Sequence, residues 1–282
     1  MTEAVTLDRF LNGRITVAQP VSGFRAGHDS VLLAAAVPAE PDSHVLELGS
    51  GAGVATLCLA ALVSGARITG IEIDPDLVRL ANENAARNAF ADRVWFIAAD
   101  VAITPHGSVD ANLESTSPSW GGRTAASHSR ESGSGGGQMP EGASLQLGSF
   151  DHVFFNPPFH PDSAHVSPVA ARDRATRDSS DAVRAWTGRA LALAREGGTV
   201  TAIVRADRVE EILDAARDYG GIVFPLLPRL GAAPKRTIVR ILKRIGGRFS
   251  TAAGLILHES DGRSTEAAEA VLRHGRSLTI AP

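Results

Sequence analysis

The sequence predicts an α/β fold built on a doubly wound, mainly parallel sheet of seven strands, with a short N-terminal extension and a disordered insertion. Apolar runs of strand length alternate with segments whose apolar residues recur at helical spacing, which is typical of parallel sheets covered by helices. Glycine-rich and polar motifs follow several strands, at the edge where such sheets bind their ligands. With 282 residues, 44% of them hydrophobic, the chain suffices for one large domain of this class.

The predicted elements follow one another in regular order. Strands are expected at 44–49, 67–73, 94–98, 151–155, 199–204, 222–227 and 237–242, and helices at 54–64, 75–88, 181–195 and 207–219. Pro75 suits a first helical turn, because its missing N–H would have no partner there. The predicted domain therefore covers residues 41–103 and 149–282, and residues 1–40 precede it as a separate segment.

Residues 104–148 differ in composition from the rest of the chain. Nine of these 45 residues are Gly and nine are Ser, and Ser132 to Gly137 reads Ser-Gly-Ser-Gly-Gly-Gly. Such a segment buries too little apolar surface to offset the entropy lost on ordering. It is expected to be a flexible insertion, and a lid over the substrate is the alternative.

Composition excludes several classes of protein. The net charge of -3 gives no global signal for binding a polyanion, so any nucleic-acid surface must be local. The one cysteine, Cys58, rules out an internal disulfide framework, fits a reducing cytoplasm, and lies in an apolar run typical of a buried thiol. No signal peptide and no apolar run of about 20 residues is found, so a soluble cytoplasmic protein is expected. The nine histidines show no paired metal-ligand spacing, and no metal is predicted.

The segment from Glu47 to Gly53, Glu-Leu-Gly-Ser-Gly-Ala-Gly, lies where the first predicted strand turns into a helix. Its glycines allow a tight turn and a close approach of backbone to ligand. The third glycine comes one position earlier than in the dinucleotide pattern, which disfavours a pyrophosphate. Glu72 ends the second strand, 23 residues after Gly49, where a carboxylate can accept both hydroxyls of a ribose. Asp100 follows the third strand and can accept a hydrogen bond from an adenine amino group.

The fourth strand, 151–155, stops at Asn156-Pro157-Pro158-Phe159. Each proline biases the residue before it toward an extended conformation, which leaves the Asn156 side chain and the Pro157 carbonyl free as acceptors. A conjugated amino nitrogen is a poor nucleophile, because its lone pair is delocalised into the ring. Two acceptors that bind its hydrogens favour a tetrahedral nitrogen, so catalysis would rest on positioning and electrostatics. Phe159 offers a flat face on which a base or amide can stack.

These motifs resemble class I S-adenosylmethionine-dependent methyltransferases with a Rossmann-like sheet, in the branch that uses Asn/Asp-Pro-Pro-Phe/Tyr to methylate amino nitrogens. The resemblance extends to the bacterial valine-tRNA adenine-N6 methyltransferases through Gly13-Arg14-Ile15, Gln19-Pro20, Gly23 to Gly27 and Ala233-Pro234-Lys235-Arg236. It covers nearly the whole chain except the insertion. It implies S-adenosylmethionine as cofactor and tRNA as partner, with the adenine beside the anticodon as target.

The resemblance also implies roles for individual residues. The segment 1–40 would close over substrate and cofactor, with Gly23 to Asp29 against the methionine moiety. The residues assigned to the cofactor are Glu47, Gly49, Gly51, Gly53, Glu72, Asp100, Arg25 and Asp29. The residues assigned to catalysis are Asn156, Pro157, Pro158 and Phe159, and those assigned to RNA are Arg172, Arg174, Lys235, Arg236 and Arg240.

A local basic run supports contact with RNA. Seven basic residues and no acidic ones lie between residues 220 and 258. They are Arg229, Lys235, Arg236, Arg240, Lys243, Arg244 and Arg248. Concentrated positive charge lets a mildly acidic protein bind a phosphate backbone. Arg236, Arg240 and Arg244 recur every four residues, so a strand would put them on one face.

Three alternatives remain open on the sequence. A protein-glutamine methyltransferase needs the same two acceptors, because a side-chain amide is also planar. That group usually carries Tyr at the position of Phe159 and a helical N-terminal domain, for which the roughly 45 residues before the glycine motif are too few. DNA adenine methylation lacks an apparent base-reading domain. A non-catalytic RNA-binding module would have no chemical need for the intact motif at Asn156.

Overall fold

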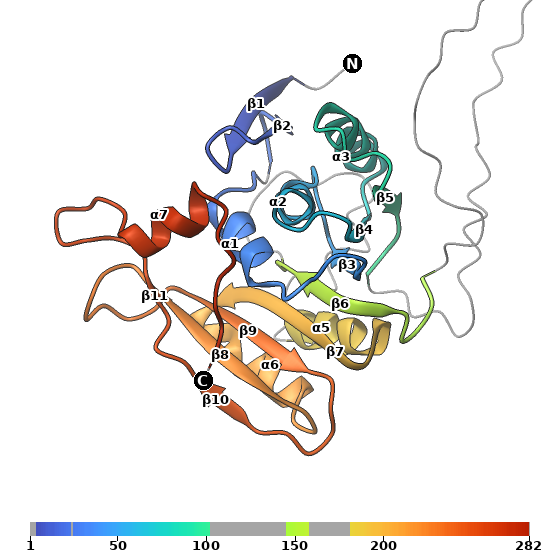
Figure 1. Ribbon diagram of the computed structural model, residues 1–282. Coiled ribbons are helices and arrows are strands. Elements are labelled where there is room, and N and C mark those ends of the chain that lie inside the picture. The colour runs from blue at the N-terminus through green and yellow to red at the C-terminus, as the bar shows by residue number, and fades with distance from the viewer. Residues whose placement is uncertain (1–3, 24, 102–144, 158–180, 282) are drawn as a thin grey trace, which may run out of the picture.

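The computed structural model describes residues 4–23, 25–101, 145–157 and 181–281 (Figure 1). Its strands are β1 (Val5–Phe10), β2 (Ile15–Pro20), β3 (His44–Leu48), β4 (Arg67–Glu72), β5 (Val94–Ala98), β6 (Phe150–Phe155), β7 (Ala194–Arg205), β8 (Gly220–Leu227), β9 (Arg236–Leu242), β10 (Phe249–Thr251) and β11 (Leu255–Ile256). Its helices are α1 (His28–Ala36), α2 (Val54–Leu62), α3 (Pro75–Arg87), α5 (Asp181–Leu193), α6 (Val209–Ala215) and α7 (Glu266–Leu272), with a 3₁₀ turn at Ala206–Arg208.

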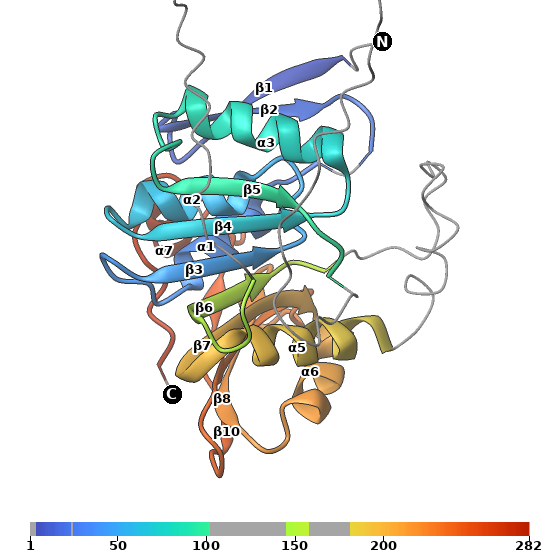
Figure 2. The ribbon, with the colours of Figure 1, turned by 90° about the vertical axis from the view of Figure 1, so that its right-hand side faces the viewer.

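One large sheet runs through the molecule in the order β10-β8-β9-β7-β6-β3-β4-β5, with β11 also paired to β8. The strands β5, β4, β3, β6 and β7 are parallel to one another, and β9 is antiparallel to both β7 and β8. In Figure 2, β5, β4, β3, β6 and β7 lie one below another. The doubly wound, mainly parallel sheet is confirmed. The predicted number of seven strands is too low, because β10 and β11 add two short strands beside β8.

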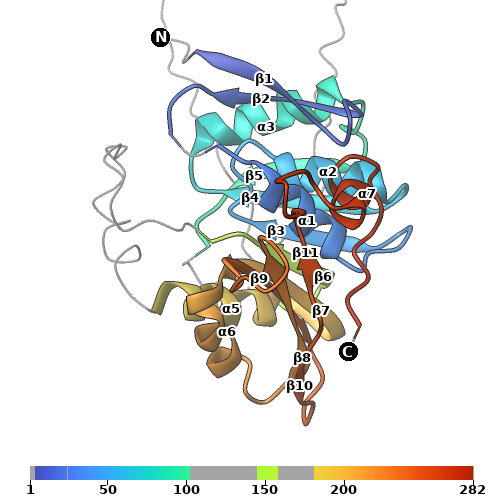
Figure 3. The ribbon, with the colours of Figure 1, turned by 90° about the vertical axis from the view of Figure 1, so that its left-hand side faces the viewer.

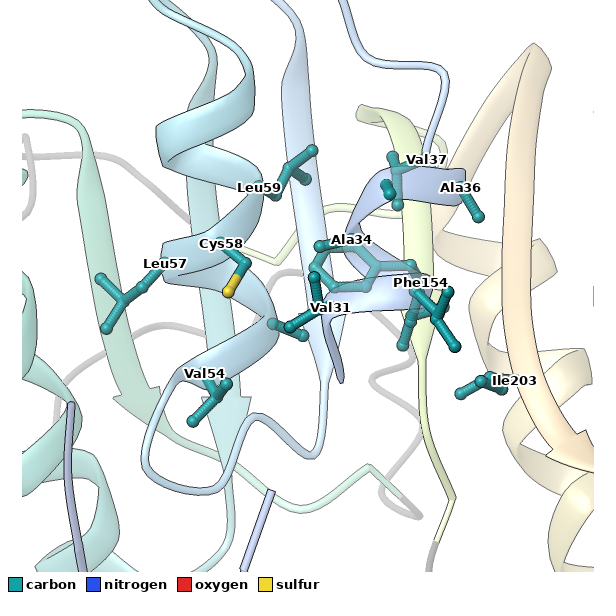
Figure 4. Close-up of a cluster of buried hydrophobic side chains, with 14 of the residues drawn as sticks. Val31, Ala34, Ala36, Val37, Val54, Leu57, Cys58, Leu59, Phe154 and Ile203 are labelled. Carbon is teal, nitrogen blue, oxygen red and sulfur yellow. The ribbon is translucent and has the colours of Figure 1, made fainter. Parts of the chain in front are cut away.

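Two hydrophobic cores lie on opposite faces of this sheet. One is formed with α1, α2, α3 and α7, and the other with α5 and α6 (Figures 1 and 3). Because side chains alternate along a strand, Phe154 enters the first core and Phe155 the second. Figure 4 shows Phe154 near α1 and the Cys58 thiol on α2 among apolar side chains. Cys58 is fully buried, as predicted, and burial raises the pKa of its thiol.

The N-terminal residues form a hairpin and a helix that the sequence analysis did not divide into elements. β1 and β2 pair antiparallel, and α1 packs in the first core. Two asparagines of α3 take the place of a neighbouring strand beside β2. Asn84 accepts from the Ala18 N–H at 2.8 Å and donates to its carbonyl, and Asn88 does the same for Thr16 at 3.0 and 2.8 Å. Asn84 also donates to the Ala52 carbonyl at 3.0 Å, which joins the hairpin to the glycine turn.

Two predicted boundaries are wrong. β7 begins at Ala194, so Gly197 and Gly198 lie inside a long strand and do not end the preceding helix. A Cβ at Gly198 would lie 2.6 Å from the Asp151 carbonyl oxygen, which explains why glycine occupies this close approach of β6 and β7. The helix predicted at 207–219 is a 3₁₀ turn followed by α6, which ends at Ala215.

Other boundaries agree with the sequence. α3 begins at Pro75 as predicted, and the Asp74 side chain caps it by accepting from the Asp76 N–H at 2.9 Å.

Within the described ranges, the helices are too short or too polar to span a bilayer.

Candidate active site

The predicted motifs meet at one edge of the sheet. β3, β4, β5 and β6 are adjacent and parallel, so their carboxyl ends lie together. The glycine turn follows β3, Glu72 ends β4, and Asp100 lies two residues beyond β5. Asn156 directly follows β6. The topology therefore brings together residues that follow four different strands. Of these, Gly49 and Asn156 are more than a hundred positions apart in the sequence.

The glycine turn is packed at both ends and open in the middle. Gly49, Gly51 and Gly53 have φ of 67°, 54° and 87°, in the left-handed region that favours glycine. A Cβ at Gly49 would lie 2.6 Å from Cη2 of Trp186, and a Cβ at Gly53 would lie 2.6 Å from Cζ of Phe96. A Cβ at Gly51 would meet nothing within 4 Å. The backbone at Gly51 therefore faces space that a ligand can enter.

Glu47 supports this turn from inside the protein. Its Oε2 accepts from the Thr56 hydroxyl at 2.5 Å and from the Thr56 N–H at 3.0 Å. Gly53 has no side chain with which to cap α2, so Glu47 caps the helix from the neighbouring strand. Burial raises the pKa of Glu47 to about 8, although both Thr56 hydrogen bonds act in the opposite direction. Glu47 is predicted from the sequence to bind the cofactor, and in the structure its carboxylate bonds to Thr56 of α2.

Glu72 is held in place by the backbone around it. Oε2 accepts from the Gly51 N–H at 2.9 Å, and Oε1 accepts from the N–H groups of Ile73 and Asp74 at 2.8 and 3.1 Å. Burial raises the pKa of Glu72, and these three donors oppose that shift. Glu72 thus links the end of β4 to the middle of the glycine turn. Its fixed carboxylate retains acceptor sites, because two oxygens have about four in all.

Asp100 follows β5, the strand that pairs with β4. The Ala99 N–H donates to the Glu72 carbonyl at 2.9 Å, which continues the pairing of β4 and β5 past their last strand residues. Asp100 is half-buried. The two carboxylates predicted to bind an adenosine moiety therefore follow neighbouring strands.

Asn156 has a buried acceptor. Its Oδ1 is inaccessible to solvent, and no donor in the described part of the chain bonds to it. Buried polar atoms in proteins nearly always have partners, and the Oγ of Ser50 in the glycine turn also lacks one in the described part of the chain. Pro157 is buried beside it. Pro158 and Phe159 lie outside the described residues, as do Arg172, Arg174 and most of the predicted insertion.

The N-terminal residues assigned to the cofactor are held by ion pairs. Arg25 binds Asp8 of β1 at 2.5 Å and donates to the Pro20 carbonyl. Asp29, in the first turn of α1, accepts from Arg236 at 2.9 Å. The second pair joins α1 to the start of β9, and both of its side chains are about one-third exposed.

The basic run does not form one face. Arg236 is paired with Arg205, at the carboxyl end of β7, whereas Leu242 is paired with Thr199 near the other end. Arg229 and Lys235 therefore lie with Arg236 at the edge that carries the candidate site. The remaining basic residues of the run, Lys243, Arg244 and Arg248, lie at the opposite edge, roughly 20 Å away along β9.

Arg240 corrects the prediction of a shared basic face. It lies mid-strand in β9 and donates to the carbonyls of Ala36, at the end of α1, and Ile280. Burial lowers its pKa to about 10. A guanidinium tied to two carbonyls inside the fold is a structural group, so Arg240 does not line an exposed surface with Arg244.

Trp186 is the residue at this site that the sequence analysis missed. It lies in α5, contacts Gly49, and forms a tilted aromatic pair with Phe155 at a centroid distance of 5.9 Å. No local pattern marks it, because the contact joins a helix to a turn far away in sequence. A cavity of about 430 Å³ lies elsewhere, between the hairpin tip and α7, and none of the predicted site residues lines it.

Comparison with known proteins agrees with this geometry. A family model described as a methyltransferase domain matches residues 39–113, which include the glycine turn, Glu72 and Asp100. Residues 39–113 therefore match a methyltransferase domain, and the sheet has the Rossmann-like fold of class I S-adenosylmethionine-dependent methyltransferases. A crystal structure of a predicted O-methyltransferase from Agrobacterium tumefaciens has the same fold, with a TM-score of 0.64 and 23% identity over 89% of this chain and 98% of that one.

Curated relatives of this methyltransferase share most of its length. A tRNA1(Val) (adenine(37)-N6)-methyltransferase of Porphyromonas gingivalis is 28% identical, over 83% of this chain and 79% of the relative. A protein of the same name from Bacteroides fragilis is 23% identical over 80% of each chain. One from Actinobacillus pleuropneumoniae is 22% identical over 89% of each. The resemblance expected from the motifs is confirmed along the chain.

Proposed function

We propose that this chain transfers a methyl group from S-adenosylmethionine to the N6 amino nitrogen of an adenine in tRNA. The observation that carries the proposal is the buried Oδ1 of Asn156, which has no donor in the described part of the chain and follows β6 beside the glycine turn. The names of the relatives support adenine 37 of a valine tRNA as the target.

The residues around the turn suit the cofactor. Gly51 offers backbone that a ligand can approach, Glu72 offers fixed acceptor oxygens for ribose hydroxyls, and Asp100 offers an acceptor for an adenine amino group. Glu47 shapes the turn through α2. When bound, S-adenosylmethionine supplies an electrophilic methyl group on a sulfonium.

Asn156 and Pro157 act on the acceptor nitrogen. The Asn156 Oδ1 accepts one N–H of the amino group and the Pro157 carbonyl accepts the other. Withdrawing these hydrogens from the plane of the ring favours a tetrahedral nitrogen whose lone pair can attack a methyl carbon. No strong base is needed, because the nitrogen becomes acidic once it is alkylated. Phe159 would stack on the target base.

Basic groups at the same edge would bind the RNA backbone. Lys235 is exposed, and Arg236 and Arg229 lie near it at the carboxyl ends of β7 and β8. Arg172 and Arg174, which follow the catalytic motif in sequence, would also contact the RNA. Positive charge beside a site is the usual means by which a protein without a basic global charge holds a polyanion.

One assay tests the proposed function against its alternatives. The purified chain is incubated with methyl-labelled S-adenosylmethionine and, separately, unmodified valine tRNA, duplex DNA or a release factor. Label on N6-methyladenine of the tRNA is the expected result. Label on protein glutamine, or binding of tRNA without transfer, would contradict the proposal.

A further inference from the structure

One aromatic side chain contacts both halves of the site. The six-membered ring of Trp186 lies against Gly49, close enough that a Cβ there would be 2.6 Å from Cη2 and 3.0 Å from Cζ3. The same indole lies 5.9 Å from the ring of Phe155, with the two planes inclined by 57°. Phe155 is the residue before Asn156. Trp186 therefore contacts the first residue of the cofactor turn and the neighbour of the acceptor oxygen.

The backbone ladder alone does not fix these two positions. The last registered pair between β3 and β6 is Leu48 with Phe155, so Gly49 and Asn156 both lie one residue past it. Gly49 has no side chain to pack, and its φ of 67° lies in the left-handed region that favours glycine. The turn is bonded to β4, because the Ser50 N–H donates to the Ile71 carbonyl and the Gly51 N–H donates to Glu72, both at 2.9 Å. On the side of β6, Trp186 is a side chain that contacts both Gly49 and Phe155.

We propose that Trp186 is a positioning residue, which sets the distance between the cofactor turn and Asn156 and so aligns the methyl donor with the acceptor nitrogen. This inference rests on the function proposed above for Asn156. A rigid indole suits the task, because its two ring faces and edges hold both neighbours with few internal rotations. A displacement of about 1 Å between reacting groups costs roughly 100-fold in rate, so the spacing has a measurable consequence.

Phe96 provides a matched control. It packs against the other end of the same turn, where a Cβ at Gly53 would lie 2.6 Å from its ring. Phe96 lies in β5, and both β3 and β4 separate that strand from β6 in the sheet. Loss of the Phe96 ring disturbs the cofactor turn without directly affecting the strand that carries Asn156.

The kinetic test compares Trp186→Leu, Trp186→Phe and Phe96→Leu in methyl transfer to tRNA. We expect Trp186→Leu to lower kcat about 10- to 100-fold while the KM for S-adenosylmethionine changes less than about threefold. Trp186→Phe should restore most of kcat, because a ring again contacts both neighbours. Phe96→Leu should chiefly raise the KM for the cofactor. Equal losses of kcat in the two leucine variants would overturn the proposal.

Hydrogen exchange gives a second readout that needs no activity. In Trp186→Leu, amide exchange should become faster both in the peptide containing 46–53 and in the one containing 153–156. In Phe96→Leu only the first peptide should change. Unaltered exchange at 153–156 in a folded Trp186→Leu protein refutes the positioning role. If the wild-type chain methylates no RNA, the proposed function fails, and the exchange data still decide whether Trp186 joins the two segments.

Discussion

The polar side chains of the site differ in whether the protein already satisfies them. The Glu47 carboxylate bonds to Thr56 and is buried, and the Glu72 carboxylate receives three backbone N–H groups. The Asn156 Oδ1, in contrast, has no donor in the described part of the chain. The first two groups hold the turn in shape, and the third is the acceptor that the proposed function assigns to the target amino group.

Asn156→Ala should reduce methyl transfer at least about 100-fold, because it removes an acceptor that acts on the reacting nitrogen. Cofactor affinity should stay within a few-fold, since the glycine turn and Glu72 are untouched. The matched variant Asn156→Asp keeps an acceptor oxygen and should retain more activity than the alanine variant. Steady-state kinetics and calorimetric titration with S-adenosylmethionine measure both effects. Loss of cofactor binding in Asn156→Ala would contradict the assigned role.

Glu47 should make the protein less stable as pH rises. Its pKa of about 8 in the folded state exceeds the ordinary value of 4.5, so between these values the folded chain binds more protons than the unfolded chain. Stability from this group is therefore complete below about pH 4.5 and is lost as the pH rises through 8. Glu47→Gln keeps an acceptor for Thr56 but cannot ionise.

Thermal unfolding of the two proteins at pH 5 and pH 8 tests this linkage. The drop in Tm between these pH values should be smaller in Glu47→Gln by roughly 3 °C or more, the shift that about 1 kcal/mol makes in a chain of this size. Parallel profiles for the wild type and the variant would show that Glu47 is ionised throughout the range.

Among the elements, the docking of the N-terminal hairpin on α3 is the least expected. A strand edge normally needs another strand, yet here the amides of Asn84 and Asn88 bond to alternate residues of β2. The spacing of four residues puts both amides on one face of the helix. Asn84 also donates to the Ala52 carbonyl in the glycine turn. A change in the position of the hairpin is therefore expected to change the conformation of the turn.

Asn84→Ala should destabilise the protein by about 3 kcal/mol, because it leaves the buried polar groups of Ala18 and Ala52 without partners. Asn88→Ala is the control, since Asn88 is half-buried, bonds to Thr16 and has no link to the turn. Its loss should cost about 1 kcal/mol and leave cofactor affinity unchanged. Denaturant unfolding and cofactor titration measure the two variants. If Asn84→Ala and Asn88→Ala affect cofactor binding equally, the hairpin and the glycine turn are not coupled through Asn84.

The order of elements from β3 to β9 could be predicted from the sequence, because apolar periodicity and glycine breaks mark these strands and helices, whereas β10, β11 and α7 were not predicted. The contacts that complete the site could not. Trp186 meets Gly49 only through packing of α5 on the sheet, and Asn84 meets Ala18 only through the placement of the hairpin. The boundary of β7 was also missed, because a Gly-Gly pair usually ends a helix, whereas here Gly198 permits the close approach of β6 and β7.

Over the whole molecule, the sheet separates the basic run into two groups. A regular four-residue spacing predicted one face for Arg236, Arg240 and Arg244, but β9 ends before Arg244 and Arg240 turns inward. The basic residues that follow one another in the sequence are therefore divided between two edges of the sheet. One group lies at the edge with the candidate site and the other lies at the opposite edge. The proposed function therefore assigns RNA binding to the first group, which lies at the edge of the candidate site.

Lys235→Ala should weaken tRNA binding about three- to tenfold and reduce the salt dependence of the affinity by about one ion, because a phosphate contact is lost. Arg244→Ala removes the same charge at the opposite edge and should change affinity less than twofold. Binding isotherms at several salt concentrations distinguish the two. If Arg244→Ala has the larger effect, the RNA binds at the edge of the sheet opposite the candidate site.

The placement of Arg240 has a practical consequence for work with this chain. Its guanidinium bonds to the carbonyls of Ala36 and Ile280, while the Leu278 N–H donates to Ala35 at 2.7 Å. Leu278 and Ile280 are both buried. The segment after α7 is thus hydrogen-bonded to the end of α1 and contributes side chains to the first core. Deleting it for crystallisation would expose that core. An affinity tag fused there should carry a spacer.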